Sequence, residues 1–206
     1  MSPRYKNDNR RQVMSLTRER LVSAAVEEFA REGYEGANIN RITQAAGVAT
    51  GTIYNYFPSK NELMLAILNE IGTAHCAFIA EQVRLETDFL MRVRRLFGAG
   101  FDYVRQNPAQ AKIIFAMLQG TNQAFRLQLS QNYQPMFDLI SSDILIPGMA
   151  QGAFQPLDPA ATAMMIMTFY LGVGSMMDEN GETLLNLNDI EDFVLRALGA
   201  KITTRE

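Results

Sequence analysis

The chain of 206 residues has very few of the side chains that enzymes most often use for catalysis or metal binding. It contains one histidine, His75, and one cysteine, Cys76. Residues adjacent on a helix do not face each other, so we do not expect these two to form a catalytic dyad. The sequence has no metal-ligand spacing, no glycine-rich phosphate loop and no GxGxxG or GxSxG motif. It therefore predicts no enzyme, no metal site and no cofactor.

Further absences bear on where the protein works. A single cysteine excludes an intrachain disulfide, and a reducing cytoplasm is the simplest setting for such a chain. The first fifteen residues are polar and lack the apolar run of a signal peptide, so we expect a cytoplasmic protein with a disordered basic tail over residues 1–15. This tail is either simply solvated or an arm that reaches the phosphates or the minor groove of DNA.

Charge is absent from one long stretch, residues 160–177, which borders on the length of a membrane span. Its flanks are acidic, at Asp158 and at Asp178-Glu179, and lack the basic residues that anchor spanning helices. We therefore predict no membrane contact. A helix that is apolar all round in a water-soluble chain has to be buried on more than one side.

The charges that are present are divided unevenly along the chain. Residues 1–60 carry nine Lys/Arg and six Asp/Glu, a net charge of +3, whereas residues 61–206 carry ten and sixteen, a net charge of −6; together these give the −3 of the whole chain. DNA attracts the first part and repels the second. This division favours a DNA-binding domain joined to a body with another task.

Two short helices joined by a tight turn are predicted between Asn38 and Lys60. Asn38 is a good helix N-cap, and Gly47 permits the positive φ that the turn needs. The second helix, over residues 50–57, has apolar residues on one face and polar residues on the other. The apolar positions of the two helices are Ile39, Ile42, Ala46, Ile53 and Phe57. This is the arrangement of a helix-turn-helix, whose second helix enters the DNA major groove.

A third helix follows the corner at once. Ser59-x-x-Glu62 is a capping box, and Lys60 lies at the helix N-terminus, where backbone donors already attract anions such as phosphate. Corners of this kind also occur in all-α proteins that never touch DNA. The basic, capped third helix favours DNA binding.

The corner resembles the N-terminal domain of the TetR family of bacterial transcriptional regulators. The resemblance extends from about Thr17 to Leu68 and depends on three motifs that keep the family's spacing. They are Ala-Ala-Gly-Val (45–48), Gly-Thr-Ile-Tyr-Asn-Tyr-Phe (51–57) and Lys-Asn-Glu-Leu (60–63). Beyond this region the chain is similar to the family only in length and helical character.

Two positions depart from the family pattern. Thr43 stands where the family usually has alanine, and we expect its hydroxyl to bond back to the carbonyl of Ile39. Ala49 stands where a serine often caps the second helix, so one phosphate-facing hydroxyl is missing. We expect Thr50 to take over as cap or contact.

Nine residues of the corner are candidates for contact with DNA. Tyr54 and Lys60 are placed to hold phosphates and set the register. Asn38 or Asn40, at the start of the preceding helix, adds phosphate contacts. Gly51 leaves room for close approach of the backbone. The side chains placed to meet base edges are those of Thr50, Thr52, Asn55 and Tyr56.

The chain as a whole is predicted to be all-α, with about nine helices in two domains. The three-helix helix-turn-helix domain occupies residues 16–60, and a helical ligand-binding and dimerisation domain occupies residues 61–206. We expect Pro147-Gly148 to kink or end a helix and Asn188-x-x-Glu191 to cap the last one. The helices of the second domain are expected at about 59–84, 88–106, 108–118, 122–146, 159–177 and 189–199.

Two-sided burial of the 159–177 helix predicts a homodimer. Together with the 189–199 helix it can form a four-helix bundle with the same pair from a second chain, and Gly172 and Gly174 would allow close approach. In the TetR resemblance the last two long helices do this. A dimer presents two recognition helices to half-sites about 34 Å apart, or a multiple of it, so the operator should be near-palindromic double-stranded DNA.

Methionine is abundant, with 12 residues, several of them in the 159–177 helix. Each one alone is most simply core filling, but together with aromatic residues they favour a deformable apolar cavity. The expected ligand is a hydrophobic or amphipathic small molecule. The candidate lining residues are Phe101, Met117, Phe125, Tyr133, Phe137, Met167 and Tyr170.

These features support a ligand-responsive, DNA-binding transcriptional regulator, most simply a repressor that its ligand releases from the operator. The alternative is a helical protein that binds or sequesters a small molecule, with the corner as scaffold only. A helical-bundle enzyme is the third hypothesis, and the missing catalytic constellation disfavours it.

Overall fold

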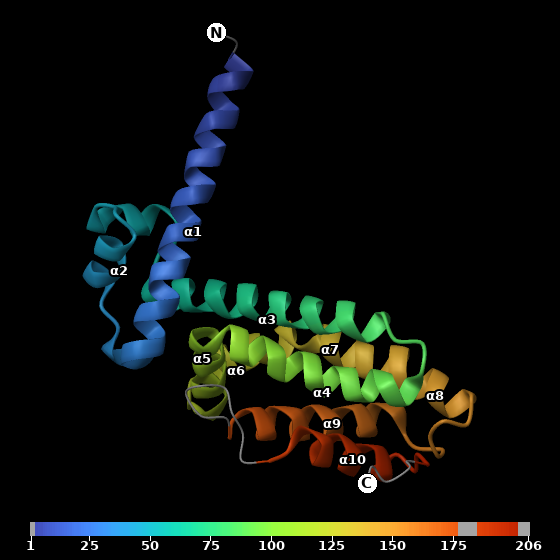
Figure 1. Ribbon diagram of the computed structural model, residues 1–206. Helices are drawn as coiled ribbons and strands as arrows, with labels where there is room; N and C mark the ends of the chain where they lie inside the picture. Colours follow the sequence, from blue (N-terminus) through green and yellow to red (C-terminus); the bar gives the residue numbers. More distant parts are fainter. Residues whose placement is uncertain (1–2, 177–184, 202–206) are drawn as a thin grey trace.

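The computed structural model describes residues 3–176 and 185–201, with side chains described from Arg11 onward. Within these residues every regular element is helical: ten α-helices, a 3-10 helix and a π-helix, without a strand. The prediction of an all-α protein is confirmed, with one α-helix more than the nine expected. Figure 1 shows two parts, a small group of helices around α1 and a larger body of stacked helices below it.

The first helix, α1 (Pro3–Gly36), begins earlier than the sequence suggests. Residues 3–15, where we predicted a disordered tail, are helical and continue directly into the amphipathic part of α1. Pro3 is tolerated because it lies in the first turn, and good helix formers such as arginine, glutamine and methionine follow. Near its end the helix is interrupted at Gly33, whose φ of 71° only glycine adopts readily. The first turns project beyond the rest of the molecule (Figure 1).

The predicted corner is present. Helix α2 (Ile39–Ala45) is capped by Asn38, whose side chain accepts a hydrogen bond from the backbone N–H of Asn40. Gly47 turns the chain with a φ of 68°. The second helix differs from the prediction, since η1 (Thr50–Asn55) is a 3-10 helix and ends before Phe57.

The two departures from the family pattern explain part of this local structure. The Thr43 hydroxyl donates to the carbonyl of Ile39 over 3.1 Å, as predicted. Ala49, at the N-cap of η1, supplies no side-chain hydrogen bond. The start of η1 therefore lacks the cap that a serine would give it.

Helix α3 (Lys60–Arg84) connects the corner with the body. Ser59 caps it by accepting from the backbone N–H of Glu62, as predicted. Among the described residues, α3 is the one helix long and apolar enough to cross a membrane by length and composition. Half of that stretch is buried inside the fold, as is common for core helices, so the feature is weak support for a span.

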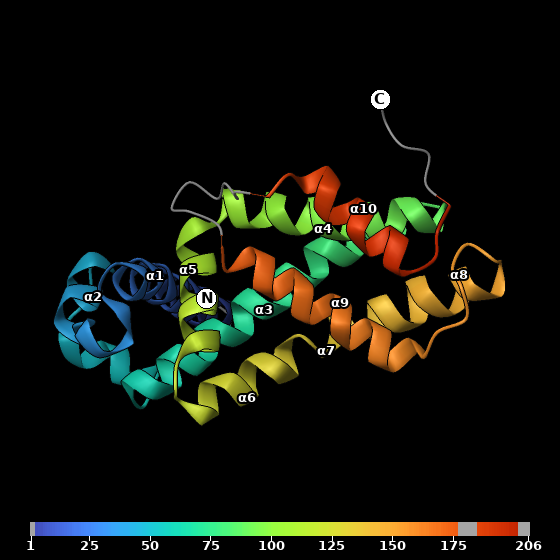
Figure 2. The ribbon, with the colours of Figure 1, turned by 90° about the horizontal axis from the view of Figure 1, so that it is seen from below.

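The body is a stack of helices against α3. Helix α4 (Phe89–Gln106) lies along α3. Helices α9 (Pro159–Gly174) and α10 (Leu187–Ala197) lie on the side of α4 that faces away from α3 (Figures 1 and 2). Between α4 and α9 the chain forms α5 (Pro108–Gln119), α6 (Gln123–Asn132), α7 (Gln134–Asp138), η2 (Leu139–Leu145) and α8 (Ile146–Ala150). The last part of α9 as predicted, at residue 177, lies outside the described residues.

The prediction of a single helix over residues 122–146 is wrong. The chain is divided there into α6, α7 and the π-helix η2. Pro135 has no backbone N–H to continue α6, and it lies in the first turn of α7 instead. Pro147 does not end the segment, because it falls in the first turn of α8, which continues to Ala150. The last helix, α10, is capped by Asn186 rather than Asn188.

Candidate nucleic-acid interface and effector cavity

The corner turns its apolar side chains inward and its polar side chains outward. Ile42 and Ile53 are each 1% exposed, and Phe57 is 4% exposed. Six of the nine predicted DNA contacts are exposed and three are partly buried. The exposed residues are Asn38, Asn40, Thr50, Gly51, Tyr54 and Asn55, and the partly buried ones are Thr52, Tyr56 and Lys60. The structure thus brings the predicted set to one corner and leaves most of it open to a partner.

A buried carboxylate holds α1 against α2. Glu28 is 3% exposed and accepts hydrogen bonds from the backbone N–H of Asn38, at 3.0 Å, and from Arg41, at 2.8 Å. Arg31 is its second ionic partner. Burial alone would raise the pKa of Glu28, but these hydrogen bonds and the two arginine charges outweigh it and lower the pKa. This cluster was not predicted from the sequence, because Asn38 and Arg41 are ten and thirteen residues from Glu28.

Lys60 is engaged more closely than the sequence predicts. Its ammonium group donates to the carbonyls of Glu35, at 3.0 Å, and Ala37, at 2.9 Å, and lies 5.0 Å from the ring centroid of Tyr34. It therefore ties the end of α1 to the start of α3. An ammonium has three N–H donors, so one remains for another acceptor such as a phosphate oxygen.

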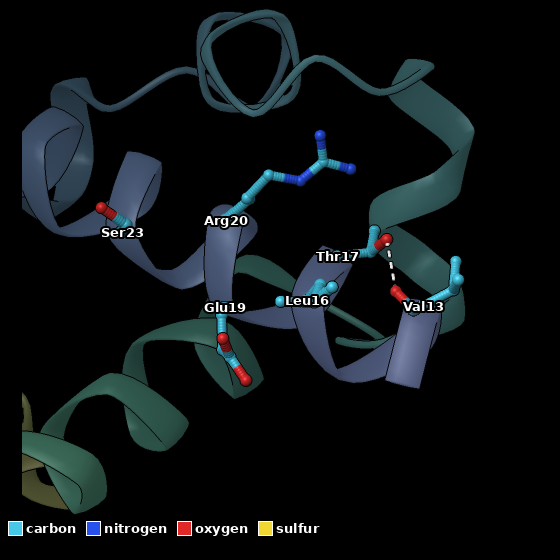
Figure 3. A pocket seen from close by; sticks show the side chains of 6 residues that line it. All are labelled: Val13, Leu16, Thr17, Glu19, Arg20 and Ser23. Atoms are coloured by element: carbon cyan, nitrogen blue, oxygen red, sulfur yellow. Dashed lines mark hydrogen bonds between the residues drawn. The ribbon is translucent and has the colours of Figure 1, made fainter. Parts of the chain in front are cut away.

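Arg20 is a cationic residue that the sequence analysis did not single out. It borders an open hollow of about 590 Å³ along α1 together with Val13, Leu16, Thr17, Glu19 and Ser23. Figure 3 shows its guanidinium reaching away from α1, on the opposite side from Glu19. The guanidinium comes near the turn, since a Cβ built at Gly47 would lie 3.9 Å from it. The sequence indicates the place of Arg20 only through its neighbour: Arg20 directly precedes Leu21, which is buried, so Arg20 lies beside the packed face of α1.

The body contains a cavity of about 210 Å³ between α5, α6, α7 and α9. Its walls are mostly apolar, with polar side chains from α6, α7 and α9. The lining residues are Leu118, Arg126, Leu129, Ser130, Tyr133, Gln134, Phe137, Met164, Met167, Thr168 and Leu171.

Three of the seven predicted ligand-binding residues, Tyr133, Phe137 and Met167, line this cavity. The other four do not. Phe101 and Phe125 are 1% exposed and belong to the core. Met117 packs against that core, and Tyr170 borders a separate void of about 10 Å³. Sequence spacing places all of these side chains inside the body, but it cannot tell a cavity wall from a packed core.

The single histidine is part of a polar cluster in the core. His75, on α3, lies between two tyrosine hydroxyls, with Nδ1 2.8 Å from Tyr133 and Nε2 2.9 Å from Tyr170. The ring of Tyr103 stacks on the imidazole, with centroids 4.5 Å apart. Burial lowers the pKa of His75 to about 4, because charging it there would cost desolvation. Burial also raises the pKa of Cys76 to about 11, although a backbone hydrogen bond opposes it.

The surface of α9 and α10 carries exposed apolar side chains. Met165 is 69% exposed, Phe193 61% and Met164 57%. Nothing lies within 4 Å of a Cβ built at Gly172, so α9 is open there. Gly174, which we expected to face a second chain, instead faces the ring of Phe115 inside the body.

One arginine fixes α10 to α4. Arg94 donates to Glu191 at 2.8 Å and to Asp192 at 2.6 Å, and its side chain is only 13% exposed. Burial alone would lower the pKa of Arg94, but its two carboxylate partners outweigh it and raise the pKa. In residues 3–176 and 185–201, no three His, Cys, Asp or Glu side chains lie close enough to hold a metal ion.

Comparison with known proteins agrees with this geometry. The family model for bacterial regulatory proteins of the tetR family matches residues 21–67. The chain is 31% identical over 130 residues to the HTH-type transcriptional activator FasR of Mycolicibacterium smegmatis; the match covers 61% of this chain and 59% of FasR, less than two thirds of that relative's length.

Two solved structures show the same fold. The regulator FadR from Bacillus subtilis, in complex with stearoyl-CoA, has a TM-score of 0.75 at 22% identity and covers 87% of this chain and 96% of its own. AibR, in complex with isovaleryl coenzyme A and operator DNA, has a TM-score of 0.66 at 18% identity and covers 88% of this chain and 97% of its own. Through residues 21–67 the chain belongs to the tetR family of bacterial regulatory proteins, and as a whole it shares the fold of these two solved structures.

Proposed function

We propose that the protein is a cytoplasmic, homodimeric repressor that binds a near-palindromic operator and leaves it when a hydrophobic or amphipathic molecule occupies the body. The outward polar face of the corner carries this proposal. A face of exposed amide, hydroxyl and phenol groups over a fully packed apolar base is suited to hydrogen bonding with a large polar partner. The net charge of +3 in residues 1–60 makes DNA the partner that fits.

Within the corner, eight of the nine residues divide into three roles, and the ninth, Asn38, caps α2. Tyr54, 53% exposed, together with Asn40 and the remaining N–H of Lys60, contacts phosphates. Side chains of η1 and of Tyr56, which follows it directly, meet base edges in the major groove. Nothing lies within 4 Å of a Cβ built at Gly51, so the backbone there can approach the DNA closely. The proposed base-contacting residues are Thr50, Thr52, Asn55 and Tyr56.

We assign DNA binding to residues 16–60, and ligand binding and dimerisation to residues 61–206. The dimer forms through α9 and α10, whose exposed methionines and Phe193 would be covered by the same helices of a second chain. The Arg94 contacts with Glu191 and Asp192 hold α10 in place for this interface. Two chains then present two corners to half-sites about 34 Å apart, or a multiple of it.

The cavity between α5, α6, α7 and α9 is the proposed effector site. Its apolar wall suits an alkyl chain, and Arg126 among its lining residues suits an anionic group. FadR and AibR, which share the fold, were each solved with an acyl-CoA. We therefore propose an acyl compound as the effector, and an acyl-CoA as the first class to test.

The DNA-binding proposal is tested by fluorescence anisotropy with the DNA upstream of the protein's own gene, over a range of salt concentrations. We expect salt-sensitive binding, and Thr52→Ala should alter base preference in a set of operator variants without changing the salt dependence. Thr121→Ala, an exposed threonine between α5 and α6, is the matched control and should change neither. Absence of salt-sensitive DNA binding would favour the alternative function, a protein that only binds or sequesters a small molecule.

A further inference from the structure

The cluster around His75 has more hydrogen-bond donors than its two internal bonds can use. The imidazole is neutral at physiological pH because burial lowers its pKa to about 4. It therefore has one N–H and one lone pair. Its two nitrogens contact two hydroxyls, those of Tyr133 and Tyr170.

Three hydrogens are thus available for two hydrogen bonds. One bond uses the imidazole N–H, and the tyrosine that accepts it keeps its own O–H hydrogen. The other bond uses the hydroxyl hydrogen of the second tyrosine. Whichever tautomer His75 adopts, one hydroxyl hydrogen is left for an acceptor outside the cluster. Leaving a buried donor without an acceptor is unfavourable, so this hydrogen has a strong preference for a partner.

The surroundings distinguish the two tyrosines. Tyr170 borders the void of about 10 Å³ but does not line the cavity of about 210 Å³, and its hydroxyl is packed so closely on α4 that a Cβ built at Gly100 would overlap it. That void is at the lower limit for a single water molecule. Tyr133 borders the same void and also the cavity of about 210 Å³. Tyr133 is therefore the member of the cluster with access to an organic ligand.

We propose that the Tyr133 hydroxyl donates a hydrogen bond to the acyl carbonyl oxygen of the effector, and so makes an acceptor on the ligand a requirement for tight binding. This inference rests on the proposed effector cavity. It fixes the tautomer of His75: Nδ1–H donates to Tyr133, and Nε2 accepts from Tyr170. The ligand then joins a continuous chain of hydrogen bonds that includes α3 and α9, and bonds in such a chain strengthen one another.

A matched pair of ligands tests the acceptor requirement by isothermal titration calorimetry. Octanoyl-CoA carries the thioester carbonyl, and the thioether S-octyl-CoA lacks it. We expect the wild-type protein to bind octanoyl-CoA about tenfold more tightly, as for one buried hydrogen bond. In Tyr133→Phe the two affinities should become equal. Tyr103→Phe is the control and should keep the wild-type preference. The substitution retains the ring that stacks on His75 and removes a hydroxyl that donates to Gln110, not to the cluster.

Equal binding of the two ligands by the wild-type protein would overturn the proposal. This is the result expected if a water molecule in the small void, and not the ligand, accepts the hydroxyl hydrogen. Failure of both ligands to bind would also overturn it. In either case the anisotropy assay with operator DNA separately decides whether the DNA-binding proposal stands.

A second measurement uses the fact that the chain has one histidine. Selective ¹⁵N labelling of histidine gives the nitrogen shifts of His75 alone, and these report protonation and tautomer directly. With octanoyl-CoA bound we expect the neutral ring with hydrogen on Nδ1. Hydrogen on Nε2 in the bound state would contradict the proposed direction of the chain.

Discussion

The rings of Tyr34 and Phe125 meet edge to face, with centroids 4.9 Å apart and planes at 75°. Tyr34 belongs to the last turns of α1, beside the corner, whereas Phe125 belongs to α6, which also lines the cavity. The same tyrosine lies under the ammonium of Lys60. The pair is therefore a direct contact between the proposed DNA-binding domain and α6, one of the helices that line the proposed effector site.

A double-mutant cycle measures this contact. We expect Tyr34→Leu and Phe125→Leu to be coupled by about 0.5–1.5 kcal/mol in the free energy of unfolding, because each removes the same ring pair. Leu127, also on α6 but 59% exposed, supplies the control, and Tyr34→Leu with Leu127→Ala should be additive. Additivity of the first pair in urea unfolding would show that the ring contact contributes nothing.

Lys60→Ala should have two effects that are measured separately. Loss of the bonds to the carbonyls of Glu35 and Ala37 should lower the free energy of unfolding by about 1–3 kcal/mol. If the third N–H contacts a phosphate, the slope of log K against log salt should also flatten by about 0.9. Lys112→Ala, an exposed lysine of α5, should change neither quantity. A destabilised variant with an unchanged slope would remove Lys60 from the phosphate contacts and leave it a structural tie.

His75 should make stability depend on pH. Its pKa falls from 6.5 to about 4 on folding, so between these values the unfolded chain binds more protons than the folded one. The contribution of His75 is fully present above pH 6.5 and is lost as the pH falls towards 4, by about 3 kcal/mol in total. Urea unfolding at several pH values should show this slope in the wild type. His75→Gln, which cannot titrate, should be less stable at pH 7 and nearly flat from pH 6.5 to 5; an equal slope in both proteins would assign the effect to other groups.

Phe193→Glu should disrupt the dimer. The side chain is 61% exposed in the single chain and lies on α10, so a carboxylate there would be buried without a partner if two chains pack through this surface. Sedimentation velocity at micromolar concentration should show a dimer for the wild type and a monomer for the variant. Leu127→Glu introduces the same charge at a similarly exposed site on α6 and should leave the dimer intact. A wild-type monomer would contradict the proposed interface.

Local chemistry made much of the fold predictable. Asn38 and Ser59 cap the expected helices, and Gly47 makes the expected turn, because each of these effects depends on a few neighbouring residues. The same holds for the bond from Thr43 to Ile39. Such short-range rules determine where a helix begins and where a turn is possible.

Long-range packing was not predictable in the same way. The buried Glu28 cluster, the contacts of Lys60 and the pair Arg94–Glu191 each join residues that are at least ten positions apart. The π-helix η2 was not predictable either, since its sequence has no break that a periodic pattern could show. For the same reason, the aromatic residues that we predicted to line one cavity do not all do so. Tyr133 and Phe137 lie in its wall, whereas Phe101 and Phe125 lie in the packed core.

The length of α3 gives small movements in the body a large effect at the corner. Its 25 residues span about 37 Å, and Lys60 fastens the end of α1 to its first turn. A tilt of about 3° at the far end would carry that first turn about 2 Å sideways, and the symmetric tilt in a second chain would bring the total change to about 4 Å. The DNA-binding surface therefore lies at one end of a long, stiff helix, and His75 makes its hydrogen bonds between the two ends of that helix.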